Sequence, residues 1–367
     1  MVEWKKLGEV CEVIRGKRVT KGDLLENGKY PVISGGVTPM GFINSFNREP
    51  NTITVSQYGT AGYVDFQKER FWANDICYSL YPSEQLNNKY LWYVLKNKQA
   101  FLYSIRNTDA VPYSLPIDSL KKVTIPITPL SEQQRIVGIL DTFTSSIENL
   151  KEQIAQRRKQ YEYYRDQLLD LEGKEGVEMK TLGDIAKYRR GSFPQPYGNK
   201  EWYDGEGAMP FVQVADVEEY GRKLKDHTKQ FISKLAMPKS VFVPAGTVIV
   251  TLQGSIGKVA ITQYDSYIDR TLGIFEGYFI DINKVYFALQ LEKIFSIKKE
   301  KARGGTIKTI TKEEFTNFSI PVPSLSEQQR IVSILDTFEA SIQNLEQQLA
   351  QREKQYEYYR NILLSFE

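Results

Sequence analysis

Two stretches of the chain carry an apolar residue alternately every third or fourth position for about five heptads. In the first stretch these positions are Ile136, Leu140, Phe143, Ile147, Leu150, Ile154, Tyr161, Tyr164 and Leu168. In the second stretch they are Ile331, Leu335, Phe338, Ile342, Leu345, Leu349, Tyr356, Tyr359 and Leu363. An apolar period of 3.5 residues held for this length is typical of a coiled-coil seam. The pattern therefore predicts two long helices, in 130–172 and 325–367, that pair through these residues.

The two stretches are copies of one another. The motif SEQQRIV occurs at Ser131–Val137 and again at Ser326–Val332, and about 31 of 43 aligned positions are identical. Both motifs fit the S-x-x-Q pattern of a capping box, which places each helix start at the serine. The seam is interrupted by Arg157 in the first copy and by Arg352 in the second. Two roles remain open for these arginines, namely a buried polar layer that fixes register or a charge that reaches solvent.

The segments outside the helices are related more distantly. KKLGEVCEVIRGK at Lys5–Lys17 resembles KTLGDIAKYRRGS at Lys180–Ser192, and GTAGYV at Gly59–Val64 aligns with GSIGKV at Gly254–Val259. Runs rich in β-branched residues precede both Gly-x-x-Gly turns, and one amphipathic helix follows in each half, which favours an α+β class.

The chain thus has the order domain, helix, domain, helix, with boundaries at 1–129, 130–172, 173–324 and 325–367. Because the second helix starts where the second domain ends, it must run back along the first. We expect two pseudo-two-fold-related mixed α/β domains separated by an antiparallel two-helix coiled coil about 60 Å long.

Composition adds a modest indication about the partner. Apolar content of 41%, charged content of 25% and a net charge of +3 are ordinary for a soluble protein. By segment, however, 1–129 and 173–324 each carry about +4 and the two helices together about −5, which weakly favours polyanion binding by the domains. No apolar run suggests a membrane span or a signal peptide, so we expect a cytoplasmic protein without membrane contact. Cys11 and Cys77 are expected to be buried free thiols.

Catalytic motifs are missing from the sequence. It contains no G-x-x-x-x-G-K-[ST] loop for ATP, no Asn-Pro-Pro-Tyr stretch for amino methylation of a base, and no zinc-ligand spacing. The single histidine, His227, lies in a charged run without a nucleophile motif, where a solvated role is expected. We therefore expect a non-catalytic protein without a metal or cofactor of its own.

The best candidates for nucleic-acid contact are loops. Glycine lets a backbone approach a ligand, hydroxyl and basic side chains bind phosphate, and glutamine can pair with adenine. The residues selected on this chemistry are Arg15, Lys17, Arg18, Gln57, Tyr58, Thr60, Arg189, Arg190, Ser192, Gln253, Ser255, Lys258, Arg303 and Lys308. Plain β-turns and solvated surface loops remain open as alternatives. Aromatic residues suited to stacking are Tyr58, Tyr63, Tyr197 and Trp202, although core packing is the commoner role of such rings.

Taken together, the two LSEQQRIV…LDTF…YEYYR helices, the LGE and LGD openings and the G-x-x-G-x-V turns resemble the specificity subunit of Type I restriction-modification systems. The resemblance covers essentially the whole chain. It implies two target-recognition domains, each reading half of a bipartite asymmetric site in double-stranded DNA. It also implies an antiparallel spacer on which two DNA methyltransferase subunits dock.

In such a complex S-adenosylmethionine is bound by the methyltransferase subunits, and ATP and Mg²⁺ by restriction subunits. Whether methylation and restriction lie on separate partners or on one fused enzyme stays open. The alternative hypothesis is a non-enzymatic coiled-coil adaptor that does not bind DNA.

Overall fold

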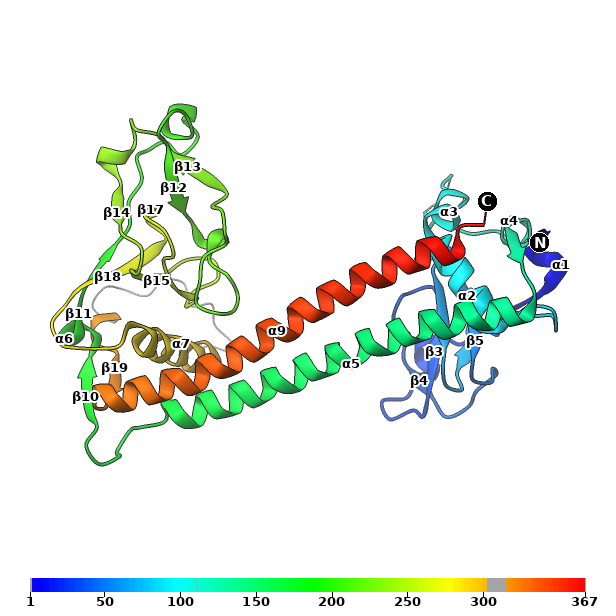
Figure 1. Cartoon of the computed structure of the whole chain (residues 1–367), viewed down its shortest axis with the longest axis horizontal. Coiled ribbons are helices and arrows are strands. Elements are labelled where there is room, and N and C mark those ends of the chain that lie inside the picture. Colours follow the sequence, from blue (N-terminus) through cyan, green and yellow to red (C-terminus); the bar gives the residue numbers. More distant parts are fainter. Residues whose placement is uncertain (1, 110, 302–314, 367) are drawn as a thin grey trace. The chain divides into compact units, whose positions relative to one another are not determined.

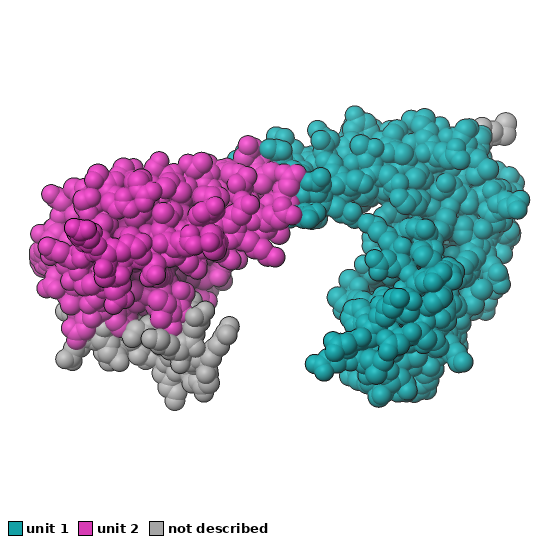
Figure 2. All heavy atoms as spheres, turned by 90° about the horizontal axis from the view of Figure 1, so that it is seen from below, with its two compact units in different colours: residues 1–152, 347–367 teal, residues 153–346 magenta. Residues whose placement is uncertain are grey.

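The computed structural model describes residues 2–109, 111–301 and 315–366. The chain forms two compact units, one of residues 1–152 with 347–367 (unit 1) and one of residues 153–346 (unit 2) (Figure 2). The long helices α5 (Leu130–Leu169) and α9 (Leu325–Leu364) each contribute one part to either unit (Figure 1).

Unit 1 is built around an antiparallel four-stranded sheet of order β2-β8-β5-β6. Its strands are β2 (Cys11–Arg15), β8 (Cys77–Pro82), β5 (Thr52–Ser56) and β6 (Val64–Gln67). A smaller sheet contains β4 (Phe42–Ile43), β3 (Tyr30–Ile33) and β7 (Trp72–Ala73), and a two-stranded one contains β1 (Glu3–Lys6) and β9 (Thr124–Ile127). The short helices are α1 (Leu7–Val10), α2 (Asn88–Asn97), α3 (Gln99–Ser104), α4 (Ile117–Lys121) and the 3₁₀ turn η1 (Lys21–Asp23).

Unit 2 repeats this plan with a larger second sheet. The main sheet has the order β11-β18-β15-β16, with strands β11 (Ala186–Arg190), β18 (Leu272–Tyr278), β15 (Val248–Thr251) and β16 (Val259–Ile261). The second sheet contains β13 (Gln230–Ile232), β12 (Met209–Val212), β17 (Ser266–Ile268) and β14 (Val241–Val243). The remaining elements are β10 (Glu178–Thr181) paired with β19 (Ser319–Val322), α6 (Leu182–Ile185), α7 (Lys284–Lys301), η2 (Lys200–Trp202), η3 (Val214–Asp216) and η4 (Met237–Lys239). The expected mixed α/β plan, present twice, is confirmed.

The two long helices pack antiparallel inside each unit. In unit 1, Phe143 stacks on Tyr359 with ring centroids 5.2 Å apart, and the Lys151 Nζ lies 3.0 Å from a Glu353 carboxylate oxygen. In unit 2, Arg158 Nη2 lies 2.6 Å from a Glu346 carboxylate oxygen, and Tyr164 stacks on Phe338 at 5.3 Å. Rising numbers on α5 thus meet falling numbers on α9, as the chain order predicts.

The ends of the helices enter the cores of the globular parts. Ile136, Leu140 and Leu364 belong to the unit 1 core, together with strands β5 and β8 and helix α2. In unit 2, Ile331 and Leu335 pack with Leu169 and with Tyr286 of α7. Most of the other seam residues selected from the sequence are half-buried. The apolar contact therefore continues from each globular core into the helix pair.

The helix starts differ from the capping-box prediction, which is wrong. Both helices begin one residue before the expected serine, at Leu130 and Leu325. The Ser324 hydroxyl accepts a hydrogen bond from the Glu327 N–H, so Ser324 supplies a cap that was assigned to Ser326. Serines at 131 and 326 are exposed residues of the first turn.

The first glutamine of each SEQQ motif holds the helix start in place. Its side-chain amide is buried, and both its nitrogen and its oxygen form hydrogen bonds. The Gln133 Nε2 donates to the carbonyls of Gln85 and Thr128, and its Oε1 accepts from the Asn87 N–H at 2.7 Å. The Gln328 side chain bonds Asn283 and Pro323 in the same way. The motif therefore fastens each long helix to the start of α2 or α7.

Both cysteines are buried free thiols, as expected from the sequence. Burial raises the pKa of Cys11 to about 12, and it also raises the pKa of Cys77 to about 12. In the part of the chain that the structure describes, no helix combines the length and the apolar character required to cross a bilayer.

Candidate nucleic-acid interface

The candidate residues of each unit gather at one edge of its main sheet. Strands β2 and β5 are both antiparallel to β8, so they run parallel and their carboxyl ends lie at the same edge. Here the Arg15 Nη2 donates a 2.8 Å hydrogen bond to the Gln57 Oε1. Unit 2 has the same arrangement with β11, β18 and β15. Arg190 therefore ends β11 at the same edge where Gln253 follows β15.

A glycine follows the basic residue in both units for a packing reason. A Cβ atom on Gly16 would overlap the carbonyl oxygens of Ala73 and Asn74, and one on Gly191 would overlap those of Ile268 and Asp269. Each glycine lies close to these oxygens because the chain crosses, at this point, the segment that leads into β8 or β18. The glycines of IRGKR and YRRGS therefore fix the edge of the sheet whether or not a ligand binds.

The turn 57–62 of unit 1 is closed by internal contacts. Gly59 has a φ of +73° and packs against the Gly35 backbone. The Thr60 N–H donates to the Gly35 carbonyl at 2.8 Å, so this amide is already used inside the protein. Gln57 is buried beside Arg15, whereas Tyr58 is exposed. The exposed face of this turn is consequently the Tyr58 ring and the Arg15 guanidinium.

The turn 252–257 of unit 2 presents more polar surface. Gln253, Gly254 and Ser255 are exposed, and Gly257, with a φ of +83°, packs on the Phe295 side chain. This turn forms one wall of a hollow of about 540 Å³ whose other wall is the segment Val214–Glu219. A polar turn beside a hollow of this size offers room for a base edge or a phosphate.

The remaining basic candidates differ in how they are engaged. Lys17 and Arg18 are exposed directly after β2. The Arg189 Nε lies 2.8 Å from a Glu276 carboxylate oxygen, and Lys258 forms an ion pair with Glu219. The Ser192 hydroxyl donates to the Lys239 carbonyl at 3.1 Å. Arg303 and Lys308 lie outside the described residues. Arg15, Lys17, Arg18 and Arg190 are exposed at the two sheet edges, and Arg189 is exposed as well, within its ion pair with Glu276.

The aromatic candidates divide into surface and core. Trp202 is buried in a cluster with Phe193 and Phe211, so it is a core residue. Tyr197 is half-buried; its hydroxyl donates to Asp269, and the Arg270 guanidinium lies 4.9 Å from its ring. Tyr63 is half-buried with the Lys96 Nζ 4.5 Å from its ring. Tyr58 alone of the four is exposed.

Two residues beside Tyr58 escaped the sequence analysis. Ser114 forms isolated β-bridges with both Tyr58 and Asn107, which places Asn107 and Ser114 beside the turn 57–62. The neighbouring Arg106 guanidinium lies 5.5 Å from the ring of the exposed Tyr113. The offset of 195 residues between the repeats is a signal that could have found Tyr113, because it aligns 107–113 with the basic stretch 302–308 chosen in the second half. Arg106 comes one residue before this range.

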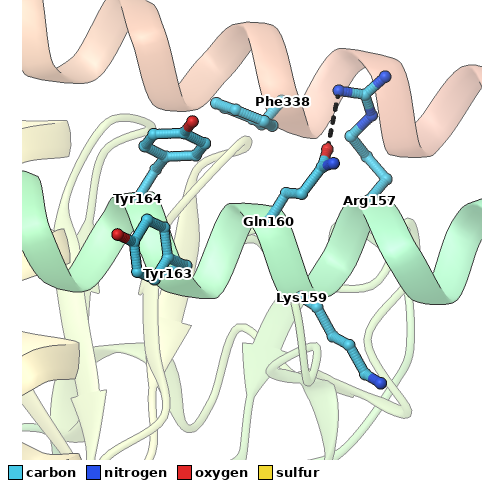
Figure 3. Close-up of a pocket in the computed structure, with 6 residues that line it drawn as sticks. All are labelled: Arg157, Lys159, Gln160, Tyr163, Tyr164 and Phe338. Atoms are coloured by element: carbon cyan, nitrogen blue, oxygen red, sulfur yellow. Dashed lines mark hydrogen bonds between the residues drawn. The ribbon is translucent and has the colours of Figure 1, made fainter.

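A second kind of surface recurs on the helix pair. In unit 2, Tyr164 stacks on Phe338, Tyr163 packs edge-on against Tyr164, and the Arg157 guanidinium lies 5.8 Å from the Phe338 ring (Figure 3). In unit 1 the same contacts join Phe143, Arg352, Tyr358 and Tyr359. We call these two sets the aromatic patches. In each patch one tyrosine is about 60% exposed, at 59% for Tyr163 and 61% for Tyr358.

The patches also answer the question of the interrupting arginines. Arg157 and Arg352 are half-buried, and each bonds a glutamine three residues later, at 3.2 and 3.0 Å. Each guanidinium lies 5.8 or 5.6 Å from the ring centroid of a phenylalanine on the opposite helix. They are thus surface residues stacked on the seam rather than a buried polar layer. The patch in unit 2 lines a hollow of about 430 Å³.

The described residues hold no cluster of three His, Cys, Asp or Glu side chains placed to bind a metal ion. His227 is exposed. Among the same residues, the groups at the sheet edges are hydrogen-bond donors, acceptors and cations. This chemistry suits binding to a polyanion with base edges.

Comparison with known proteins assigns the chain to a family. The family described as "Type I restriction modification DNA specificity domain" matches residues 1–157 and again 174–354. The EcoR124I/EcoR124II type I restriction enzyme specificity subunit of Escherichia coli is 30% identical, over all of this chain and 94% of that protein. A putative type I restriction enzyme specificity subunit of Haemophilus influenzae is 28% identical, over all of this chain and 96% of that protein.

The fold agrees with this assignment. The crystal structure of a type I restriction-modification system S subunit from M. genitalium covers all of this chain and 97% of that one, with a TM-score of 0.69 at 20% identity. An adaptor unrelated to such systems is not favoured by these matches. With both halves of the sequence matched by one family model and the whole chain matched by its relatives, the protein belongs to the type I restriction-modification DNA specificity family.

Proposed function

We propose that this chain is the DNA-recognition subunit of a type I restriction-modification complex. The segments 1–129 and 173–324 act as target-recognition domains, and each reads one half of a bipartite, asymmetric site in double-stranded DNA. The helix segments 130–172 and 325–367 set the half-site spacing and dock two methyltransferase subunits. Restriction subunits join the same complex.

The observation that carries the proposal is the recurrence of one polar constellation at the same sheet edge in both units. Arg15 and Arg190 occupy matching strand ends, and each lies at the edge where a Gly-x-x-Gly turn follows the next parallel strand. Cations beside the turn would bind phosphates, and the exposed side chains of the turn would meet base edges. Because Tyr58 stands where Gln253 stands in the other unit, the two sites should prefer different bases.

The aromatic patches support docking of two identical partners. An exposed tyrosine pair backed by a stacked phenylalanine and an arginine is a composition enriched at protein interfaces. The chain has one aromatic patch in each unit, so a partner that binds one patch should bind the other. We assign the patches as the anchoring points of the methyltransferase subunits.

The chemistry is divided between this chain and its partners. The chain supplies recognition and scaffolding, with no catalytic step of its own. S-adenosylmethionine, ATP and Mg²⁺ belong to the partner subunits, and the complex works in the cytoplasm. Whether methylation and restriction sit on separate subunits or on one fused partner is decided by the partner genes.

Recognition is tested by methylation-sensitive sequencing of cells that carry this protein with its partner genes. We expect methylated adenines in one bipartite sequence. In the purified complex, Gln253→Ala should cost about 10-fold in affinity and relax the sequence at positions of one half-site only. Lys17→Ala should weaken binding to all sequences and lower the salt slope by about 1. The exposed Gln134→Ala on α5 is the matched control. Retention of both half-site sequences by Gln253→Ala would reject this turn as a contact.

Docking is tested with Tyr163→Ala combined with Tyr358→Ala. The control replaces the neighbouring exposed residues Glu162 and Glu357 by alanine, which keeps the helix propensity high. We expect the tyrosine variant to lose both methyltransferase subunits in light scattering while the control keeps two. Equal retention by both variants would move the docking site away from the patches.

A further inference from the structure

Unit 2 contains a hairpin, residues 217–224, whose tip is strained. Val217 and Leu224 form an isolated antiparallel bridge, and the Glu218 N–H donates to the Lys223 carbonyl at 3.0 Å. At the tip, Gly221 and Arg222 have φ values of +81° and +50°. Two consecutive positive φ values are typical of the central positions of a type I′ turn, where Asn and Gly are preferred. An arginine in this conformation is unfavourable, so the structure around it must hold it there.

The Arg222 side chain is held by three helices. It is buried, and its Nη2 donates to a Glu339 carboxylate oxygen of α9 at 2.6 Å. Its Nη1 donates to the Tyr161 hydroxyl of α5 at 3.1 Å and lies 3.4 Å from a Glu292 oxygen of α7. The Tyr161 hydroxyl in turn donates to Glu339 at 2.7 Å. The tip of the hairpin is thus joined to both helices of the pair.

The charges of this cluster are unequal, since one arginine faces two glutamates. Burial disfavours the charged form of Arg222, but Glu292, Tyr161 and Glu339 outweigh it, so its pKa is raised and the cation is kept. Burial raises the pKa of Glu292 despite Arg222. Removing the arginine would leave two half-buried carboxylates without their cation. Breaking a buried ion pair by removing only one partner is strongly destabilising.

The same hairpin reaches the candidate recognition turn. Tyr220 lies under Arg158 of α5, with the guanidinium 4.8 Å from its ring. The residue before it, Glu219, forms an ion pair with Lys258, which directly follows the turn 252–257. Glu219 and Lys258 both line the hollow of about 540 Å³. The tip of the hairpin therefore contacts the helix pair through Tyr220 and Arg222, and the residue after the polar turn through Glu219.

Unit 1 fastens its helices differently. At the offset of 195 residues, Glu339 corresponds to Thr144 and Glu292 to Asn97. In the described part of unit 1, Asp141 and Thr144 hold the Tyr93 hydroxyl of α2 instead, and Asp141 also accepts from Lys89 at 2.6 Å. That anchor joins α2 to α5 and involves no hairpin from the sheet region. The hairpin anchor is therefore a property of the second half of the chain.

We propose that Arg222 is a positioning residue that fixes the DNA-reading turn 252–257 on the helix pair and so restricts the half-site spacing that the second recognition domain accepts. The inference rests on the proposed DNA-recognition function. A turn held at a fixed place on the spacer can meet its bases only when the half-sites have one separation along and around the duplex. If the hairpin is released, the turn can shift and accept neighbouring spacings.

The test uses the complete complex with its methyltransferase subunits. The variants are Glu339→Thr, which introduces the residue of the first repeat, and Arg222→Gln. Glu357→Gln, an exposed change elsewhere on α9, is the control. Binding is measured to duplexes with the natural spacer and with one base pair added or removed. We expect the preference for the natural spacer to fall by about fivefold or more in both variants and to stay unchanged in the control.

A DNA-independent measurement separates this inference from the proposed function. Spin labels at Lys159→Cys and Lys223→Cys report the distance between α5 and the hairpin, since the two native thiols are buried. We expect a narrow distribution in the parent protein and a broad one in both variants. An unchanged spacer preference, with folding intact by circular dichroism, would overturn the role of Arg222, as would an unchanged distance distribution. If the parent complex binds no sequence selectively, the recognition function itself fails and the spacing role with it, while the labels still show whether Arg222 holds the hairpin.

Discussion

The buried glutamine of the SEQQ motif allows a quantitative prediction. Gln133 is fully buried and takes part in three hydrogen bonds, two donated to carbonyls and one accepted from the Asn87 N–H. Gln133→Leu keeps a side chain of similar size but removes all three. The carbonyls of Gln85 and Thr128 and the amide of Asn87 then lose their partner at a place where water has little access.

The magnitude follows from the count of bonds. A hydrogen bond inside a protein contributes about 1 kcal/mol net, and each buried group left without a partner costs about 1–3 kcal/mol. Three groups lose their partner, and at the lower value of about 1 kcal/mol for each the unfolding free energy falls by about 3 kcal/mol. For a folding unit of this size, 1 kcal/mol shifts Tm by about 2–4 °C, so we expect a decrease of about 6–12 °C.

The assay is thermal unfolding followed by circular dichroism and calorimetry. Gln134→Leu is the matched control, because the neighbouring glutamine is exposed and its loss should move Tm little. Gln328→Leu should destabilise unit 2 in the same sense. If Gln133→Leu and Gln134→Leu unfold at the same temperature, the buried amide does not fasten α5 to the globular part, and our explanation of the repeated motif is refuted.

Three further outcomes are expected. Gly257→Ala should destabilise unit 2 by about 1 kcal/mol or more, because its φ of +83° and the adjacent Phe295 side chain leave no place for a methyl group; Gly198→Ala, with open space around it, serves as the control in urea unfolding. Leu335→Ala should cost about 2–5 kcal/mol and Leu325→Ala, half exposed, far less, as calorimetry can measure. The two thiols should resist a disulfide reagent at pH 8 and both react in urea; because their folded pKa of about 12 lies above the ordinary 9.0, the stability they contribute is complete below pH 9 and is lost as pH rises toward 12. Rapid reaction in the folded protein would contradict their burial.

The helices could be predicted because their information is local and repeated. A 3.5-residue apolar period specifies a seam without reference to the rest of the fold, and the chain order alone requires the second helix to run back. The paired units followed from the same repetition. The capping residue was predicted wrongly because Ser131 satisfies a local capping pattern, while the contacts at the helix start include a hydrogen bond between the buried Gln133 and Asn87, 46 residues away.

The candidate interface was predictable only in outline. Strand ends with Arg15 or Arg190 and the glycine turns were visible in the sequence, but their meeting at one sheet edge depends on strand order. That Gln57 is buried while Gln253 is exposed depends on packing around each turn. The Arg222 cluster joins residues from four separate parts of the chain, and no spacing rule connects them. Such tertiary clusters become visible only in the folded structure.

The ion pairs along the helices have a consequence for self-association. Lys151 and Arg158 on α5 correspond to Glu346 and Glu353 on α9 at the offset of 195 residues, and each cation faces the glutamate of the other pair. Were α5 to meet a second α5 in the same antiparallel register, Lys151 would face Arg158, and two copies of α9 would set Glu346 against Glu353. Exposed pairs of this kind contribute roughly 0.2–1 kcal/mol each, with the opposite sign for like charges. The charges therefore favour pairing of α5 with α9 over pairing of either helix with a second copy of itself. An isolated half of the protein should consequently dimerise less readily than the two unlike halves combine.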